Sequence, residues 1–204
     1  MVGFLITLSF LTYKRSESWK DSVTIFSDVI KKYPQVYMAY NNRGAAYQGI
    51  GKFEEALADF EKSIQLDNSQ FGVYNNLGTL YYDMKMPDKA ITMLTKAISI
   101  KPDFAVAFNN LGNSYSMVGR SREAIDAYNR AIQMDPNYAE AYNNLGTELL
   151  DQNEAIKAYE KALEINPHYA EAYYNLSKSY QAVGKNEEAA EAYRKARSLN
   201  PNLQ

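Results

Sequence analysis

The sequence predicts an all-α fold, a right-handed α-solenoid of about five helical hairpins with an N-terminal capping helix. Three kinds of residue recur with a period of 34 residues, and a fixed period of this length is typical of stacked helical repeats. Small residues mark one half of each unit, alanines and a large apolar residue mark the other half, and prolines close the units. The series are Gly44, Gly78, Gly112, Gly146 and then Ser177 after 31 residues; Ala56, Ala90, Ala124, Ala155 and Ala189; Phe60, Leu94, Tyr128, Tyr159 and Tyr193; and Pro34, Pro102, Pro136, Pro167 and Pro201.

Each unit is interpreted as two antiparallel helices. In the second unit Tyr74, Leu77, Gly78 and Tyr81 are spaced as one stripe of an α-helix. A polar turn follows, and its glycine suits a helix C-terminus. One hairpin cannot bury both of its faces, so neighbouring hairpins must stack. The closing proline is expected to stop the second helix and to suit the first turn of the next. The turn glycines are Gly51, Gly119 and Gly184.

These residues resemble the tetratricopeptide-repeat (TPR) family, whose repeat carries an aromatic residue, Leu-Gly, Tyr, Ala, an aromatic residue, Ala and Pro. The resemblance covers about Tyr37 to Pro201. It implies an array over residues 37–204 in which the first helices line a concave groove. The expected divisions are an apolar segment at 1–13, a capping helix at 14–36, and repeats at 37–70, 71–104, 105–138, 139–169 (shortened) and 170–204.

Two units depart from the pattern. The fourth unit lacks three residues and has no turn glycine, which predicts a shortened first helix and a tight connection near Asp151 to Asn153. This change is interpreted either as a tolerated deletion at a loop tip or as a change of superhelix curvature. In the first unit Arg43 replaces the usual leucine. Its side chain is expected to reach solvent or an acidic group such as Asp21 or Asp28.

The two ends of the sequence leave alternatives open. Residues 2–11 are mostly apolar, too few to span a membrane, and Lys14-Arg15 follow them. They are interpreted as the end of a membrane helix, as a helix packed on the cap, or as a signal remnant. The junction after Tyr13 is similar to that of multi-spanning membrane proteins with TPR tails, some of them glycosyltransferase-like. The last helix, at about 186–199, has only four further residues after Asn200, so either the chain continues or this face self-associates.

Composition argues against most chemistry. The 204 residues include no cysteine and one histidine, His168, which excludes thiolate chemistry and argues against a zinc site. Gly49 to Gly51 lacks the hydroxyl residue that would follow in a phosphate-binding loop. The net charge is −2 and no basic stripe points to nucleic acid. We therefore expect no catalytic site, cofactor or metal. The sequence does not separate a cytoplasmic from a membrane-attached location.

Asparagines recur in each predicted first helix. Asparagine is unfavourable inside helices, so its repetition needs a reason. Its amide has donors and an acceptor, which suits it to hold the backbone of an extended peptide. Alternatively, the amides hydrogen-bond between neighbouring repeats and hold the stack, and different rows can serve different purposes. The candidate peptide-binding residues are Asn42, Asn76, Asn110, Asn144 and Asn175, the adjacent Asn75, Asn109 and Asn143, and Asn113 and Lys178 in the next row.

The asparagine rows resemble the TPR arms of O-linked N-acetylglucosamine transferases, where asparagines hold substrate peptides. A clamp for a terminal carboxylate is not expected, because Lys178 and Arg43 are the basic residues near these rows. The sequence thus predicts a non-catalytic scaffold that binds a protein or peptide in a groove. The alternatives are a substrate-recruiting tail of a membrane-embedded glycosyltransferase-like protein, attached through residues before Tyr13, and a scaffold that forms homo-oligomers through its C-terminal repeat.

Overall fold

The computed structural model describes residues 21–202, which contain helices and no strand. The chain divides into two compact units, at Lys101 and Pro102. The all-α repeat architecture is therefore confirmed, while the handedness of the superhelix stays a prediction. The first unit holds a helix at residues 21–32, α2 (Tyr37–Gly49), α3 (Phe53–Leu66), α4 (Phe71–Asp83) and α5 (Pro87–Ile100); the second holds α6 (Ala105–Met117), α7 (Ser121–Met134), α8 (Ala139–Glu148), α9 (Gln152–Ile165), α10 (Ala170–Ala182) and α11 (Asn186–Leu199).

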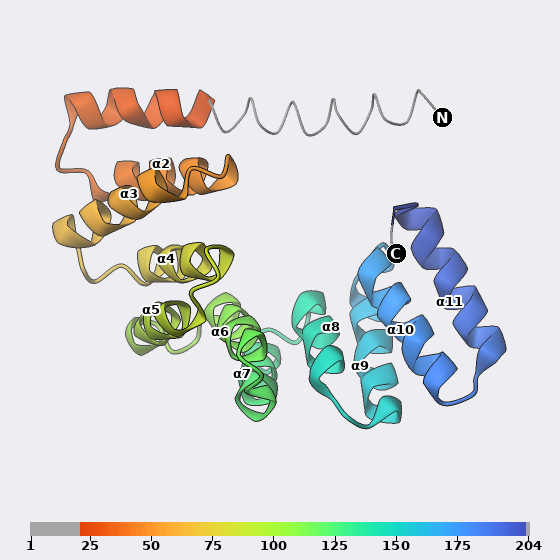
Figure 1. The fold of residues 1–204 in the computed structure, drawn as a ribbon. Helices are drawn as coiled ribbons and strands as arrows, with labels where there is room; N and C mark the ends of the chain where they lie inside the picture. The colour runs from red at the N-terminus through yellow and green to blue at the C-terminus, as the bar shows by residue number, and fades with distance from the viewer. Residues whose placement is uncertain (1–20, 203–204) are drawn as a thin grey trace, which may run out of the picture. The chain divides into compact units, whose positions relative to one another are not determined.

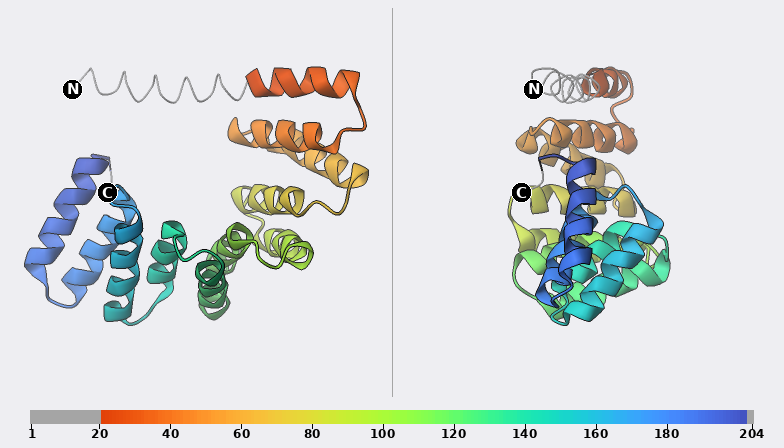
Figure 2. Two further views of the ribbon diagram at one scale, coloured as in Figure 1. Left: turned by 180° about the vertical axis from the view of Figure 1, so that it is seen from behind. Right: turned by 90° about the vertical axis from the view of Figure 1, so that its right-hand side faces the viewer.

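Consecutive helices pair as hairpins, and the hairpins stack within each unit. We call α2, α4, α6, α8 and α10 the first helices, and their partners α3, α5, α7, α9 and α11 the second helices. Each first helix packs against the second helix of its own hairpin and, within a unit, against the second helix of the preceding hairpin. In the second unit, for example, α10 lies between α9 and α11 (Figures 1 and 2).

The turns inside the hairpins follow the predicted glycines. Gly119 and Gly184 have φ angles of 72° and 79°, a left-handed conformation that glycine adopts without a steric penalty. Lys85 occupies the same position between α4 and α5 with a φ of 59°. The turn geometry is thus a property of the repeat, and glycine is the residue that adopts it with least strain.

The closing prolines have only one of their two expected roles. Pro102, Pro136 and Pro167 each follow the C-cap residue of a second helix, where the missing N–H breaks no helical bond. The next helix begins three residues later, at an alanine in each case. The expectation that these prolines form the first turn of the following helix is therefore wrong, because the chain needs a turn of its own between repeats.

The shortened fourth repeat has the predicted form. Helix α8 has 10 residues where α6 has 13, and Leu149 is extended. The carboxylate of Asp151 then caps α9 by accepting hydrogen bonds from the backbone N–H of Asn153 at 2.7 Å and of Glu154 at 3.1 Å. The core of α9 is kept, as predicted. Its buried residues include Ala155, Tyr159 and Ala162.

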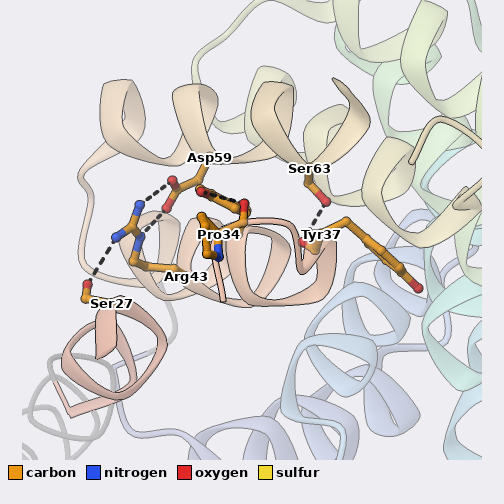
Figure 3. Close-up of polar contacts among 7 residues, drawn as sticks. Ser27, Pro34, Tyr37, Arg43, Asp59 and Ser63 are labelled. Atoms are coloured by element: carbon orange, nitrogen blue, oxygen red, sulfur yellow. Dashed lines mark hydrogen bonds and ion pairs between the residues drawn. The ribbon is translucent and has the colours of Figure 1, made fainter. Parts of the chain in front are cut away.

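Arg43 does not reach Asp21 or Asp28. Its guanidinium donates two hydrogen bonds of 2.7 Å to Asp59 on α3 and one of 3.1 Å to Ser27 on the preceding helix (Figure 3). The hydrogen bond with Asp59 raises the pKa of the Arg43 guanidinium above its usual value. Asp59 is buried, so the pair forms inside the packed hairpin. The other repeats have leucine at the Arg43 position and alanine or methionine at the Asp59 position.

No helix within residues 21–202 combines the length and apolar character needed to cross a membrane. The apolar segment at 1–13 lies outside the described residues, so its interpretation as the end of a membrane helix stays a prediction.

Glycine in the first helix allows the second helix to approach closely. A Cβ added at Gly78 would lie 2.6 Å from Cγ of Leu94, which is fully buried. A Cβ added at Gly72, in the same helix, would have no neighbour within 4 Å. We predict that Gly78→Ala lowers the free energy of unfolding by about 1–3 kcal/mol through overpacking. Gly72→Ala should raise it by up to about 1 kcal/mol through helix propensity. Urea unfolding of both variants checks this, and equal effects would contradict the close-approach account.

The Arg43–Asp59 pair replaces an apolar pair of the other repeats. We expect Arg43→Leu alone to cost about 3 kcal/mol, because it leaves a buried carboxylate without its partner. Arg43→Leu combined with Asp59→Met recreates the Leu77 and Met93 combination of the second repeat. The double variant should unfold within about 1 kcal/mol of the wild type. A double variant no more stable than Arg43→Leu would show that the two side chains are not coupled.

Candidate functional site

The predicted binding residues lie on the first helices, and we call the side of these helices that carries them the first-helix face. Within this face the structure separates the asparagines into a buried row and a partly exposed row. The buried row contains Asn75, Asn109 and Asn143, with exposed fractions of 7%, 0% and 1%. Such burial leaves little side-chain surface that a peptide could contact, and a role of these three residues in peptide binding stays a prediction.

The partly exposed row bridges neighbouring repeats. The Nδ2 of Asn76 donates to Oδ1 of Asn41 in the preceding repeat at 3.0 Å. The same bond joins Asn144 to Asn109 at 3.1 Å, and it joins Asn175 to Asn143 at 3.1 Å despite the three-residue deletion. We call this bond the amide bridge. It gives the buried amides the hydrogen-bond partners that they need away from water. The alternative in which asparagines hold the stack is therefore seen directly in the structure.

The amide bridge uses up part of the hydrogen-bonding capacity of the face. Asn144 donates both of its Nδ2 hydrogens, to Oδ1 of Asn109 and to Oδ1 of Asn113 at 3.0 Å. The Oδ1 of Asn113 also accepts from the hydroxyl of Tyr128 at 2.8 Å, which leaves its two N–H donors for a ligand. Asn175 gives one hydrogen to the bridge and keeps its oxygen and second N–H. Among residues 21–202, the side chain of Asn42 pairs within its own repeat, where its Oδ1 accepts from Nδ2 of Asn41 at 3.2 Å.

Acidic residues at the first-helix face were not among the predicted site residues. Glu140 accepts a hydrogen bond of 3.1 Å from Nδ2 of Asn109, and Glu148 accepts one from the hydroxyl of Ser116. Glu171 occupies the position of Glu140 in the next repeat. All three lie on helices that carry the asparagine rows. Each of the three lies four residues from an asparagine of the partly exposed row, Asn144 or Asn175, and this helical spacing is the signal that they carry in the sequence.

Glu140 and Glu171 affect the pKa of the two tyrosines that directly precede α8 and α10. Burial, followed by the charge of Glu140, raises the pKa of Tyr138 to about 12. Burial also raises the pKa of Tyr169, and the next contributions come from Glu171 and then Glu140. Both carboxylates therefore contribute to the raised pKa of Tyr169, at the start of α10.

The last repeat has a tyrosine, Tyr174, in place of an asparagine of the buried row. Tyr174 stands where the preceding repeats have the asparagine that accepts the amide bridge, and its ring lies 6.3 Å from that of Tyr193 and 4.1 Å from Nζ of Lys178. Tyr193 has an exposed fraction of 43%. A hollow of about 260 Å³ lies beside it and is lined by Ser177, Gln181, Asn186, Ala189, Ala190 and Tyr193. Self-association through this last repeat stays a prediction.

The two asparagine rows should respond differently to truncation. Asn109→Ala removes a buried amide that bonds both Asn144 and Glu140, so we expect a loss of about 2 kcal/mol in the free energy of unfolding. Asn42→Ala removes a partly exposed amide paired within its own repeat, and we expect a change below about 0.5 kcal/mol. Thermal and urea unfolding of both variants checks this. A silent Asn109→Ala would show that the amide bridge does not hold the stack.

Comparisons with known proteins agree with this architecture. Family profiles described as tetratricopeptide repeat match residues 35–103, 105–138, 127–158 and 170–203, and one described as TPR repeat matches residues 151–184. The crystal structure of MamA is 30% identical, with a TM-score of 0.68, over 78% of this chain and 94% of that chain. YrrB, described as a TPR protein with an unusual peptide-binding site, is 26% identical, with a TM-score of 0.65, over 87% of this chain and 93% of that chain.

Curated relatives match over shorter stretches. Hsp70-Hsp90 organizing protein 3 of Arabidopsis thaliana is 38% identical over 55 residues, which is 27% of this chain and 10% of that protein. Protein O-mannosyl-transferase Tmtc3 of Drosophila melanogaster is 29% identical over 68 residues, which is 33% of this chain and 7% of that protein. The chain thus spans a tenth or less of the length of these relatives.

The period, the hairpin geometry and the matching profiles agree over residues 35–203. Repeats of this kind form scaffolds that bind other proteins, and the stacked hairpins described here have that architecture. The chain belongs to the tetratricopeptide repeat family.

Proposed function

We propose that the first-helix face binds an extended segment of a partner protein and that the chain acts as a non-catalytic scaffold. The observation that carries the proposal is the unused hydrogen-bonding capacity of side chains repeated along one face. Asn113 offers two N–H donors, and Asn175 offers an oxygen and one N–H, after the amide bridges have formed. An extended peptide presents backbone donors and acceptors at regular intervals, so such a row suits it.

Repetition also explains how useful affinity could arise from weak contacts. One amide contact contributes about 1 kcal/mol, which alone gives negligible binding. A segment that lies across α6, α8 and α10 would add the contributions of several repeats while its ordering cost is met once. The structural likeness to YrrB, whose description includes a peptide-binding site, supports this proposal.

A matched pair of threonines tests which helices the partner touches. Thr147 on α8 and Thr92 on α5 are both exposed, and each hydroxyl bonds a backbone oxygen of its own helix, at 2.7 Å and 2.9 Å. Peptides selected by the wild type from a displayed random library should bind Thr147→Tyr at least about tenfold more weakly, because the ring blocks the face. They should bind Thr92→Tyr as they bind the wild type. Equal binding by both variants would contradict the proposal.

A second candidate function is favoured by the likeness to an O-mannosyl-transferase over 68 residues. In this proposal the repeats form the substrate-recruiting tail of a membrane-embedded glycosyltransferase-like protein. The apolar residues before Tyr13 would then be the end of a membrane helix. Mapping the 5′ end of the transcript tests it. Upstream codons for several apolar spans support this candidate, and an in-frame stop codon upstream of Met1 rules it out.

A further inference from the structure

We propose that the first-helix face of the second unit selects a partner segment that carries lysine or arginine side chains. This inference rests on the proposed function and names the chemistry of the partner.

Charge is unevenly divided between the two sets of helices in this unit. The first helix α6 has no charged residue, and α8 and α10 together carry three carboxylates and one ammonium group. The second helices α7, α9 and α11 carry eight carboxylates and seven cationic groups, which nearly cancel. The first helices therefore carry a net charge of −2 with a single cation among four charged groups, whereas the second helices carry −1 with almost one cation for each carboxylate. The four charged residues of the first helices are Glu140, Glu148, Glu171 and Lys178.

The one cation on these helices does not neutralise the acids. Lys178 is seven residues after Glu171, which corresponds to about 10 Å along the helix axis. That separation is close to the screening length at physiological ionic strength, about 8 Å. The Lys178 ammonium lies over the ring of Tyr174, 4.1 Å from its centroid. Glu140 and Glu171 meanwhile act together on Tyr169, so their fields overlap at the junction of α8 and α10.

The hydrogen bonds of α8, like its charge, favour a ligand that carries hydrogen-bond donors. Asn144 donates both of its N–H groups to asparagines of α6, the preceding first helix. Asn109 donates to Glu140 and Ser116 donates to Glu148, so both carboxylates are already oriented as acceptors and keep further lone pairs. A ligand at α8 therefore meets acceptors and few donors. Lysine and arginine side chains carry only donors, and they form their stronger hydrogen bonds with carboxylates.

The neighbouring helix supplies the complementary group for the backbone of the ligand. Asn113 on α6 keeps two N–H donors, which suit a peptide carbonyl oxygen. A segment could thus pair its backbone at α6 and place basic side chains near Glu140 and Glu171. An acidic segment would instead approach Glu140 and Glu171, which form no ion pair within residues 21–202, and this approach is unfavourable.

The test uses three labelled peptides of equal length, with serine alternating with lysine, glutamate or glutamine. Fluorescence anisotropy measures their binding to the full chain. We expect the lysine peptide to bind at least about tenfold more tightly than the glutamate peptide at low salt, with a preference that falls as salt rises. The variant Glu140→Gln/Glu148→Gln/Glu171→Gln should lose about tenfold in affinity for the lysine peptide, since each partly exposed pair contributes up to about 1 kcal/mol. Glutamine keeps an acceptor for Asn109 and Ser116, so the fold should be retained, as circular dichroism and melting would verify.

A control with the same charge change lies on the second helices. Glu154, Glu187 and Glu188 are exposed in the first turns of α9 and α11. Changing these three to glutamine should leave the affinity for the lysine peptide within about twofold of the wild type. Equal losses in both triple variants would mean that net charge alone is read, and this result overturns the inference. Equal binding of all three peptides also overturns it while leaving the proposed function intact. Binding of none of them would count against both.

Discussion

Each of the first four hairpins depends on the contact between a glycine of its first helix and a large side chain of its second helix. At Gly78 and Gly146 an added Cβ would lie within 2.6 Å of Leu94 and Tyr159, so the helices sit at a distance that only a bare backbone permits. This approach buries the inner side of each hairpin and leaves its other sides uncovered. One of these must be buried by the next hairpin. The stacking, the buried amides and the free face of the first helices all follow from that requirement.

Stacking buries polar side chains, and the amide bridge gives these side chains the hydrogen-bond partners that they lose on leaving water. A buried amide without a partner costs about 1–3 kcal/mol, whereas a paired one costs little. Asn109 and Asn143 are each paired with the asparagine of the following repeat, and the pairing survives the deletion before Asn175. The same bond therefore fixes how one repeat sits on the next and decides which side-chain groups remain for a partner.

The sequence was sufficient to predict the hairpins, because glycine, alanine and the turn glycines have steric roles that do not depend on distant residues. It also located the shortened helix α8, since the deletion removes a turn and leaves Ala155 in place. It did not reveal that Asp59 is the partner of Arg43, although Asp59 stands at a position that is apolar in every other repeat. Comparing repeats for paired departures would have found it.

The two asparagine rows could not be told apart from the sequence. Asn143 and Asn144 are adjacent and identical in chemistry, and about 100° of helix rotation separates their directions. Which one is buried depends on how far one repeat slides along the next, and no single repeat encodes that distance. The acidic character of the first-helix face was likewise hidden, because Glu140 and Glu171 lie among the many glutamates of the chain until the fold separates first from second helices.

The most direct test of the account is a backbone NMR titration of the chain with a peptide selected from a displayed library. The account predicts that amide shifts concentrate on first helices such as α6, α8 and α10, around Asn113, Thr147 and Lys178. The exposed residues of α7, α9 and α11 should change little. Shifts concentrated on those second helices, with α8 unaffected, would contradict the claim that the first-helix face is the binding surface.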